Sequence, residues 1–91
     1  MKTIMINIYA DNFDNILLHK KLNQICESVY KVSSFSYLVT YEGTPKELYD
    51  NLSDILNGRN VFVCEVYNQY ARYWGYMDKS LWAWLAENSK V

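Results

Sequence analysis

The stretch GTPKELYDNLSDILNG, residues 43–58, constrains the fold of this 91-residue chain more than any other segment. Thr44 is a typical N-cap, Pro45 suits the first helical position, and Glu47, three residues after the cap, completes a capping box. Gly58 is placed to end the helix in the left-handed conformation. The apolar residues between these signals recur at helical spacing; they are Leu48, Leu52, Ile55 and Leu56. We therefore expect an amphipathic helix whose apolar side packs on another element.

Three other segments have the composition of strands. TIMINIY, residues 3–9, has apolar residues at every second position and predicts a first strand. YKVSSFSYLVTY, residues 30–41, predicts a short strand and a longer one that form a hairpin across Ser33 and Ser34. NVFVCEVY, residues 60–67, is almost continuously apolar, as expected of a central strand that helices cover on one face.

A first helix is expected between the first strand and the hairpin. From Asp14 onward the apolar residues recur at the spacing of an amphipathic helix, which predicts a helix over about 14–29. Its apolar stripe consists of Leu18, Leu22, Ile25, Cys26 and Val29.

The resulting order, βαββαβ, predicts an α+β protein with the ferredoxin-like sandwich fold. A chain this short, with about half of its residues hydrophobic, supports one core, and three glycines and one proline leave no flexible linker. We therefore expect a single ferredoxin-like domain over residues 1–91, extended by a C-terminal aromatic strand and a short helix.

Residues 67–85, YNQYARYWGYMDKSLWAWL, contain four of the nine tyrosines and all three tryptophans. A strand over 70–77 places four large side chains on one face, and the aromatic content and Gly75 favour this interpretation over a helix. A short last helix is expected from Asp78 or Ser80. The side chains on the common strand face are Tyr70, Arg72, Trp74 and Tyr76.

Trp82 and Trp84 stand two residues apart in the expected last helix, about 200° around its axis, so they cannot both face one core. Leu81, Trp84 and Leu85 form the stripe expected to be buried, which leaves Trp82 at its border or outside. Tryptophan, tyrosine and arginine dominate binding hot spots in protein interfaces. The candidate partner-binding residues are therefore Tyr70, Arg72, Trp74, Tyr76 and Trp82.

The charge balance limits the classes of function. Nine basic and ten acidic residues give a net charge of −1, whereas wrapping a nucleic-acid duplex needs a clear excess of lysine and arginine. Direct nucleic-acid binding through stacking on the aromatic strand stays an alternative, although Arg72 is the only arginine there. No apolar run approaches a membrane span or a signal peptide, which predicts a soluble, cytoplasmic protein that does not bind membranes. Cys26 and Cys64 have no CxxC neighbour and are expected to be buried free thiols.

In the order of its segments, the stretch over residues 36–85 resembles the small bacterial proteins called SinR-like, which are relatives of the CRISPR-associated protein two family. This stretch has the sequence SYLVTYEGTPKELYDNLSDILNGRNVFVCEVYNQYARYWGYMDKSLWAWL. Those proteins similarly have a strand, a capped helix with a leucine stripe, an apolar strand ending in an acidic-apolar pair, an aromatic segment and a terminal helix like WxWL. The N-terminal third is similar in outline. The resemblance implies a ferredoxin-like homodimer in which the segment after the fourth core strand crosses to the sheet of the partner.

The resemblance also implies where a catalytic aspartate should stand in the sequence. In the nuclease members an aspartate directly follows the tyrosine that ends the first strand, and two symmetry-related copies hold a divalent metal. Here Ala10 follows Tyr9, and the acid is delayed to Asp11. Side-chain direction alternates along a strand, so this shift of one residue turns the carboxylate away unless a bulge restores it.

Other candidate catalytic groups have structural explanations. Asp11 and Asp14 would hold Mg²⁺ in a nuclease, but both are also suited to the N-terminus of the first helix. His19 lies opposite the apolar stripe, with no acid or thiol at catalytic spacing, and is expected to be a solvated surface histidine.

These observations predict a non-catalytic, dimeric interaction module that needs no cofactor and acts on a protein or ribonucleoprotein. The resemblance suggests a macromolecule of a bacterial or phage defence system as the target, as for an anti-CRISPR inhibitor or regulator. The alternative is a magnesium-dependent ribonuclease or toxin of the CRISPR-associated protein two family, with Asp11 as metal ligand. A plain structural subunit is a third hypothesis.

Overall fold

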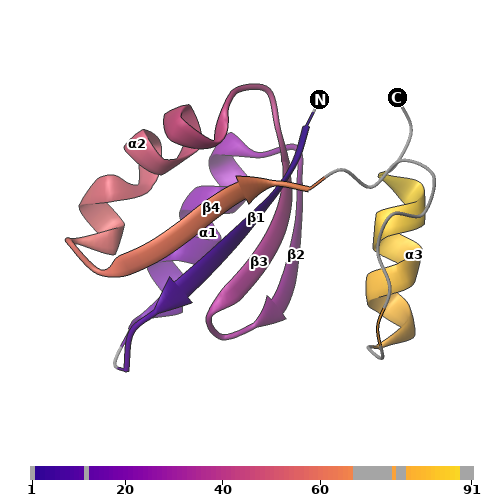
Figure 1. Cartoon of the computed structure of the whole chain (residues 1–91), viewed down its shortest axis with the longest axis horizontal. Helices are drawn as coiled ribbons and strands as arrows, with labels where there is room; N and C mark the ends of the chain where they lie inside the picture. Colours follow the sequence, from indigo (N-terminus) through magenta and orange to yellow (C-terminus); the bar gives the residue numbers. More distant parts are fainter. Residues whose placement is uncertain (1, 12, 67–74, 76–77, 89–91) are drawn as a thin grey trace.

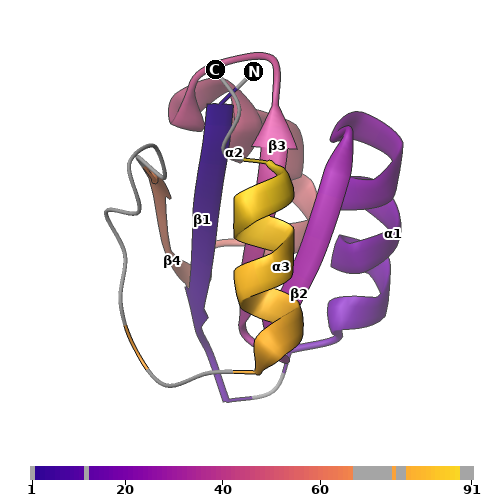
Figure 2. The ribbon, with the colours of Figure 1, turned by 90° about the vertical axis from the view of Figure 1, so that its right-hand side faces the viewer.

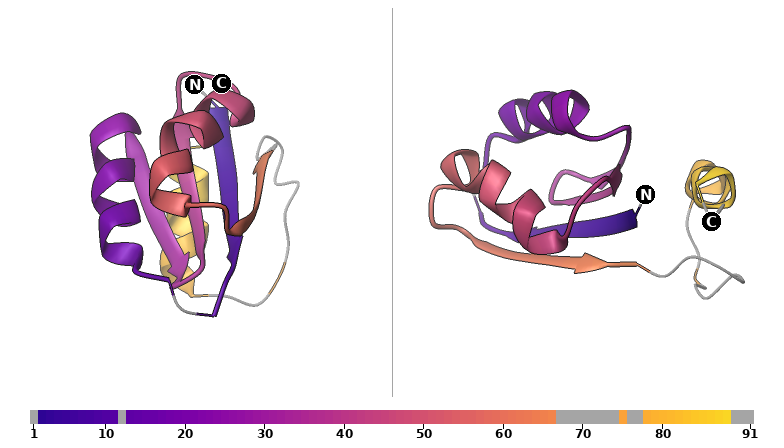
Figure 3. Two further views of the ribbon diagram at one scale, coloured as in Figure 1. Left: turned by 90° about the vertical axis from the view of Figure 1, so that its left-hand side faces the viewer. Right: turned by 90° about the horizontal axis from the view of Figure 1, so that it is seen from above.

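The computed structural model describes residues 2–11, 13–66, 75 and 78–88 and shows an α+β fold (Figure 1). A four-stranded antiparallel sheet has two helices on one face and a third helix on the other (Figure 3). The elements are β1 (Lys2–Tyr9), α1 (Asn15–Ile25), β2 (Ser28–Ser33), β3 (Ser36–Tyr41), α2 (Pro45–Leu56), β4 (Asn60–Glu65) and α3 (Lys79–Glu87). Within the described part of the chain, no helix has both the length and the apolar character needed to cross a membrane.

The strands lie in the order β2-β3-β1-β4, so β1 and β3 are central and β2 and β4 form the edges of this sheet. Met5 of β1 lies opposite Leu38 of β3 on one side and Cys64 of β4 on the other. The prediction that residues 60–67 form a central strand is therefore wrong for the described sheet. β4 is apolar for another reason: alternate side chains face the helix-covered core and a second, largely uncharged face.

The main core lies between the sheet and the helices α1 and α2. Alternate residues of the central strands supply its sheet side, and every fourth or third residue of the helices supplies the other. Its fully or nearly fully buried members include Ile4, Ile6, Leu18, Leu22, Tyr37, Val39, Leu48, Leu52 and Leu56. The core residues predicted on the two helical stripes at positions 18, 22, 48, 52 and 56 are thus confirmed.

The structure confirms the capping box and the left-handed helix end predicted within residues 43–58. The Thr44 hydroxyl accepts a hydrogen bond from the Glu47 backbone N–H at 3.1 Å, and the Glu47 carboxylate accepts one from the Thr44 N–H at 3.1 Å. Pro45 opens the helix as expected. The left-handed conformation begins at Asn57, with φ of 48°, and continues at Gly58, with φ of 75°, where a side chain would be strained.

The expected end of the first helix is wrong. α1 ends at Ile25, and Cys26 is an extended C-cap whose N–H donates to the Leu22 carbonyl at 2.8 Å. Val29 lies in β2 instead, where it packs against the same core. The apolar spacing of the helix extends to Val29 in the sequence because α1 and the following strand β2 both bury side chains in the main core. The hairpin across Ser33 and Ser34 is confirmed, since β2 and β3 pair in antiparallel register.

The last helix, α3, lies on the face of the sheet opposite α1 and α2, in front of β2 and β3 (Figure 2). Its observed start at Lys79, with Asp78 as N-cap, matches the prediction. The strand expected over 70–77, with Tyr70, Arg72, Trp74 and Tyr76, lies outside the described residues. Within that range only Gly75 is described; it is exposed and has no regular secondary structure.

Candidate interaction surface

The sheet face opposite α1 and α2, here called the open face, carries no charged side chain among the described strand residues. The strand registers place one set of side chains on this face, and all of them are apolar or neutral polar. They are Thr3, Met5, Asn7 and Tyr9 of β1, Ser28, Tyr30 and Val32 of β2, Ser36, Leu38 and Thr40 of β3, and Asn60, Phe62 and Cys64 of β4. Depletion of charge at the centre of a surface patch is typical of protein interfaces.

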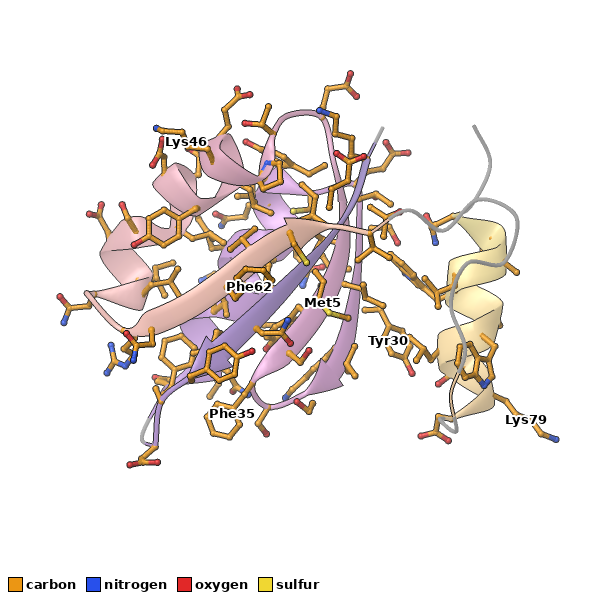
Figure 4. All side chains as sticks on the ribbon, in the orientation of Figure 1. Met5, Tyr30, Phe35, Lys46, Phe62 and Lys79 are labelled. Carbon is orange, nitrogen blue, oxygen red and sulfur yellow. The ribbon has the colours of Figure 1, made fainter. Side chains whose placement is uncertain are left out.

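α3 covers the part of the open face formed by β2 and β3. Leu81 and Leu85 are buried against Leu38 and form a second apolar cluster, separate from the main core. Tyr30 points from the sheet toward α3 (Figure 4), and its hydroxyl shares a hydrogen bond of 2.6 Å with that of Ser80. This cover therefore combines apolar packing with polar contacts at its rim.

Trp84 attaches α3 to β2. Its indole Nε1 donates to the Ser28 hydroxyl at 2.9 Å, and its ring lies 6.2 Å from the ring of Tyr30, centre to centre, with a tilt of 48°. The side chain is half-buried rather than fully buried. The predicted burial of Leu81 and Leu85 is confirmed, but the predicted burial of Trp84 is wrong, because its side chain is only half-buried beside them.

Trp82 is the only predicted partner-binding residue that lies among the described residues. It is half-buried and packs against the cluster of Leu38, Leu81 and Leu85, which agrees with the expected position at the border of the stripe. Trp84 packs against the same cluster, so the prediction that the two tryptophans cannot share one core is wrong. The far end of its indole ring lies beside Gly75, 3.8 Å from where a Cβ would stand. Its predicted binding role stays a prediction.

The remainder of the open face, over β1 and β4, has no described helix above it (Figure 2). Tyr9 is 63% exposed and Phe62 is 59% exposed, both large values for aromatic side chains. Asn7 lies directly opposite Phe62, and Tyr9 lies opposite Asn60, so the two aromatic residues are diagonal neighbours on one face. We call the group Asn7, Tyr9, Asn60, Phe62 and Cys64 the open-face patch.

The open-face patch also has a fixed polar group at its centre. The Asn7 side-chain carbonyl accepts a hydrogen bond from the Ser36 hydroxyl at 2.9 Å. This contact holds the Asn7 amide between β3 and β4 and leaves its N–H groups without a partner among the described residues. Two exposed rings around an oriented amide can bury apolar area and also donate a hydrogen bond to a partner, and aromatic residues are enriched in interfaces.

The two acids predicted as metal ligands, Asp11 and Asp14, lie at different places around the start of α1. Asp14 is the N-cap of α1, and its carboxylate accepts from the Ile16 N–H at 3.0 Å, which is the structural role expected for it. Asp11 is exposed in the bend after β1, and the prediction that it also caps α1 is wrong, because Asp14 is the N-cap. In the described part of the chain, no three histidine, cysteine or acidic side chains come together as a metal site would require.

His19 does not point into free solvent as expected. It is half-buried, and its ring centre lies 5.6 Å from that of Tyr37, a fully buried residue of β3. Both cysteines are free thiols, but only Cys26 is buried; Cys64 is half-buried on the open face. Burial raises the pKa of the Cys26 thiol to about 11, which keeps it protonated and unreactive at neutral pH.

Reasoning from the sequence missed Tyr9 and Phe62 as surface residues. The signal that could have found Phe62 is the alternation in NVFVC, where positions 61 and 63 face the main core and positions 62 and 64 therefore face away from it. Comparison of this chain with family models, with curated proteins and with solved structures finds no match.

Proposed function

We propose that this chain is a non-catalytic, homodimeric interaction module with the ferredoxin-like fold, and that two copies pair through the open-face patch. The element order βαββαβ and the strand order β2-β3-β1-β4 support the ferredoxin-like assignment. The observation that carries the functional proposal is the uncharged sheet face on which Tyr9 and Phe62 are both more than half exposed.

The absence of charge on the open-face patch favours a second copy over a nucleic acid as its occupant. A face without charges can approach its own copy in a two-fold dimer without placing like charges together. A single-stranded nucleic acid would stack on Tyr9 and Phe62 but would also need cations for its phosphates, and the described strand residues of this face supply none.

The target of the dimer is a protein or ribonucleoprotein of a bacterial or phage defence system, in the manner of an anti-CRISPR inhibitor or regulator. This part of the proposal rests on the resemblance to SinR-like proteins and the CRISPR-associated protein two family. The aromatic residues Tyr70, Arg72, Trp74, Tyr76 and Trp82 stay the proposed surface for this third party, and the protein is proposed to act in the cytoplasm.

Recovery of the tagged protein from its native host, with mass spectrometry and RNA sequencing of the eluate, tests the target. Wild type should recover a defence protein or its ribonucleoprotein, and a variant in which Arg72 and Trp74 are replaced by Ala should lose it while its circular dichroism is unchanged. Recovery of the same partner by the variant would contradict this surface, and recovery of RNA without protein would favour a stacking platform.

The alternative function is a magnesium-dependent ribonuclease with Asp11 as ligand. The exposed position of Asp11 after the end of β1 is the observation that keeps this alternative, since two copies could bring two such acids together. We expect the purified protein to leave single-stranded and double-stranded RNA and DNA intact with Mg²⁺ or Mn²⁺. Cleavage that disappears in Asp11→Ala, with Asp54→Ala as the matched control, would establish the nuclease instead.

A further inference from the structure

An open hollow of about 460 Å³ lies along α1 beside β2, on the side of the sheet opposite the open face. Its walls carry two lysines, one histidine and two asparagines but no acidic side chain. The lining residues are Asn15, Ile16, His19, Lys20, Asn23 and Lys31.

The positions along α1 explain why these groups converge. Asn15, His19 and Asn23 are four residues apart and therefore lie one above the other on a single side of the helix. Lys31 comes from the edge strand β2, where it lies opposite Tyr37 and points toward the side of the sheet that α1 covers. The helix and the edge strand thus supply opposite walls of the hollow.

Hydrogen bonds fix the asparagines and leave the cationic side chains available. The Asn15 amide donates to the Ser34 carbonyl at 3.2 Å, and the Asn23 amide donates to the His19 carbonyl at 3.1 Å. Neither Lys20 nor Lys31 has an ion-pair partner among the described residues. By contrast, Lys46 on α2 is paired with Asp50 at 2.7 Å.

The residue that packs beside His19 carries a buried donor. The Tyr37 side chain is fully buried, and its hydroxyl has no hydrogen-bond partner in the described part of the chain. Its ring packs beside the ring of His19, which lines the hollow. A buried hydroxyl without a partner costs about 1–3 kcal/mol and is commonly completed by a water. Tyr37 is not among the lining residues, so it supports the His19 ring from inside the fold rather than contacting a ligand in the hollow.

We propose that this hollow binds a phosphate group, with Lys20 and Lys31 neutralising its charge and His19 donating a hydrogen bond. Lysine ammonium groups approaching from two walls suit a tetrahedral, multiply charged anion, whereas the planar, bidentate recognition of a carboxylate is the role of arginine. The exposed side chain of Ile16 gives the hollow an apolar rim, which suits a phosphate monoester as well as the free ion. The competing explanation is that Lys31 only protects an edge strand from pairing with other chains.

A titration of the full-length protein with inorganic phosphate, followed by two-dimensional amide NMR at constant ionic strength, tests the site. We expect saturable shifts confined to residues 15–23 and the neighbourhood of Lys31. Lys20→Gln and Lys31→Gln should each weaken phosphate binding about tenfold, while Lys79→Gln should leave it unchanged. Lys79 is a suitable control because it is an exposed lysine on α3, on the other side of the sheet (Figure 4).

Two further probes separate the sources of the phosphate. Tighter binding of phenyl phosphate than of inorganic phosphate would identify a monoester as the ligand, and the reverse order would identify the free ion. Shifts that stay linear with phosphate concentration would overturn the proposal. So would equal binding of acetate, or equal weakening by Lys79→Gln with all variants folded by circular dichroism.

Discussion

Replacement of Trp84 by alanine should detach α3 from the sheet while the main core stays folded. Full burial makes a Trp→Ala change cost about 3–5 kcal/mol, and the half-buried indole of Trp84 should contribute about half of that. The hydrogen bond to Ser28 adds about 1 kcal/mol, and the contact with the Tyr30 ring adds about 0.5 kcal/mol. We therefore expect a loss of about 3 kcal/mol in the stability of α3 against opening.

The effect should be local because α3 packs through its own cluster and is short. Its buried residues Leu81 and Leu85 contact Leu38 rather than the core between the sheet and the other two helices. A helix of nine residues has little stability of its own. Amide hydrogen exchange should show a loss of protection of about 100-fold in α3, with the amides of β1 and β3 unchanged.

Trp84→Phe serves as the matched control. It keeps most of the ring burial and the contact with Tyr30 but removes the donor to Ser28, so the loss should be only about 1 kcal/mol. Ser28→Ala should cost about the same, and the double variant should cost little more than either single one. Unchanged exchange of α3 in Trp84→Ala, or loss of protection throughout the sheet, would refute the independence of the second cluster.

Two further predictions concern the main core and its helices. Thr44→Ala should lower the free energy of unfolding in urea by about 1 kcal/mol, because it removes the acceptor of the Glu47 N–H; an unchanged midpoint would argue against the capping box. The folded protein keeps a proton on Cys26 up to a pKa of about 11, whereas the unfolded thiol releases it near 9.0. Stability should therefore fall as the pH rises from about 9 to about 11, and Cys26→Ala should flatten that part of the curve; identical slopes in both proteins would contradict the buried thiol.

Local sequence signals predicted where α2 begins but not where α1 ends. Thr44, Pro45 and Glu47 act within a single turn, so the start of α2 could be read directly. The end of α1 could not, because Val29 fits the helical stripe and also faces the same core from β2. Only the pairing of β2 with β3, which depends on the distant residues 36–41, decides between the two conformations.

The candidate surfaces depend on contacts that are remote in sequence, and this is why the sequence did not reveal them. Phe62 becomes part of a patch only because β4 pairs with β1 and brings it opposite Asn7. The hollow similarly joins His19 to Lys31 through the packing of α1 beside an edge strand. The predicted aromatic strand over 70–77 lies outside the described residues and stays a prediction.

The central claim, that the open-face patch is the dimer contact, is tested most directly by sedimentation equilibrium at tens of micromolar protein. Wild type should sediment as a dimer, and so should Tyr49→Lys, which alters an exposed aromatic residue on α2 away from the open face. Phe62→Lys should sediment as a monomer with unchanged circular dichroism, because a buried, unpaired ammonium group at the contact should cost about 2 kcal/mol or more. A monomeric wild type, or a Phe62→Lys variant as dimeric as wild type, would contradict the account.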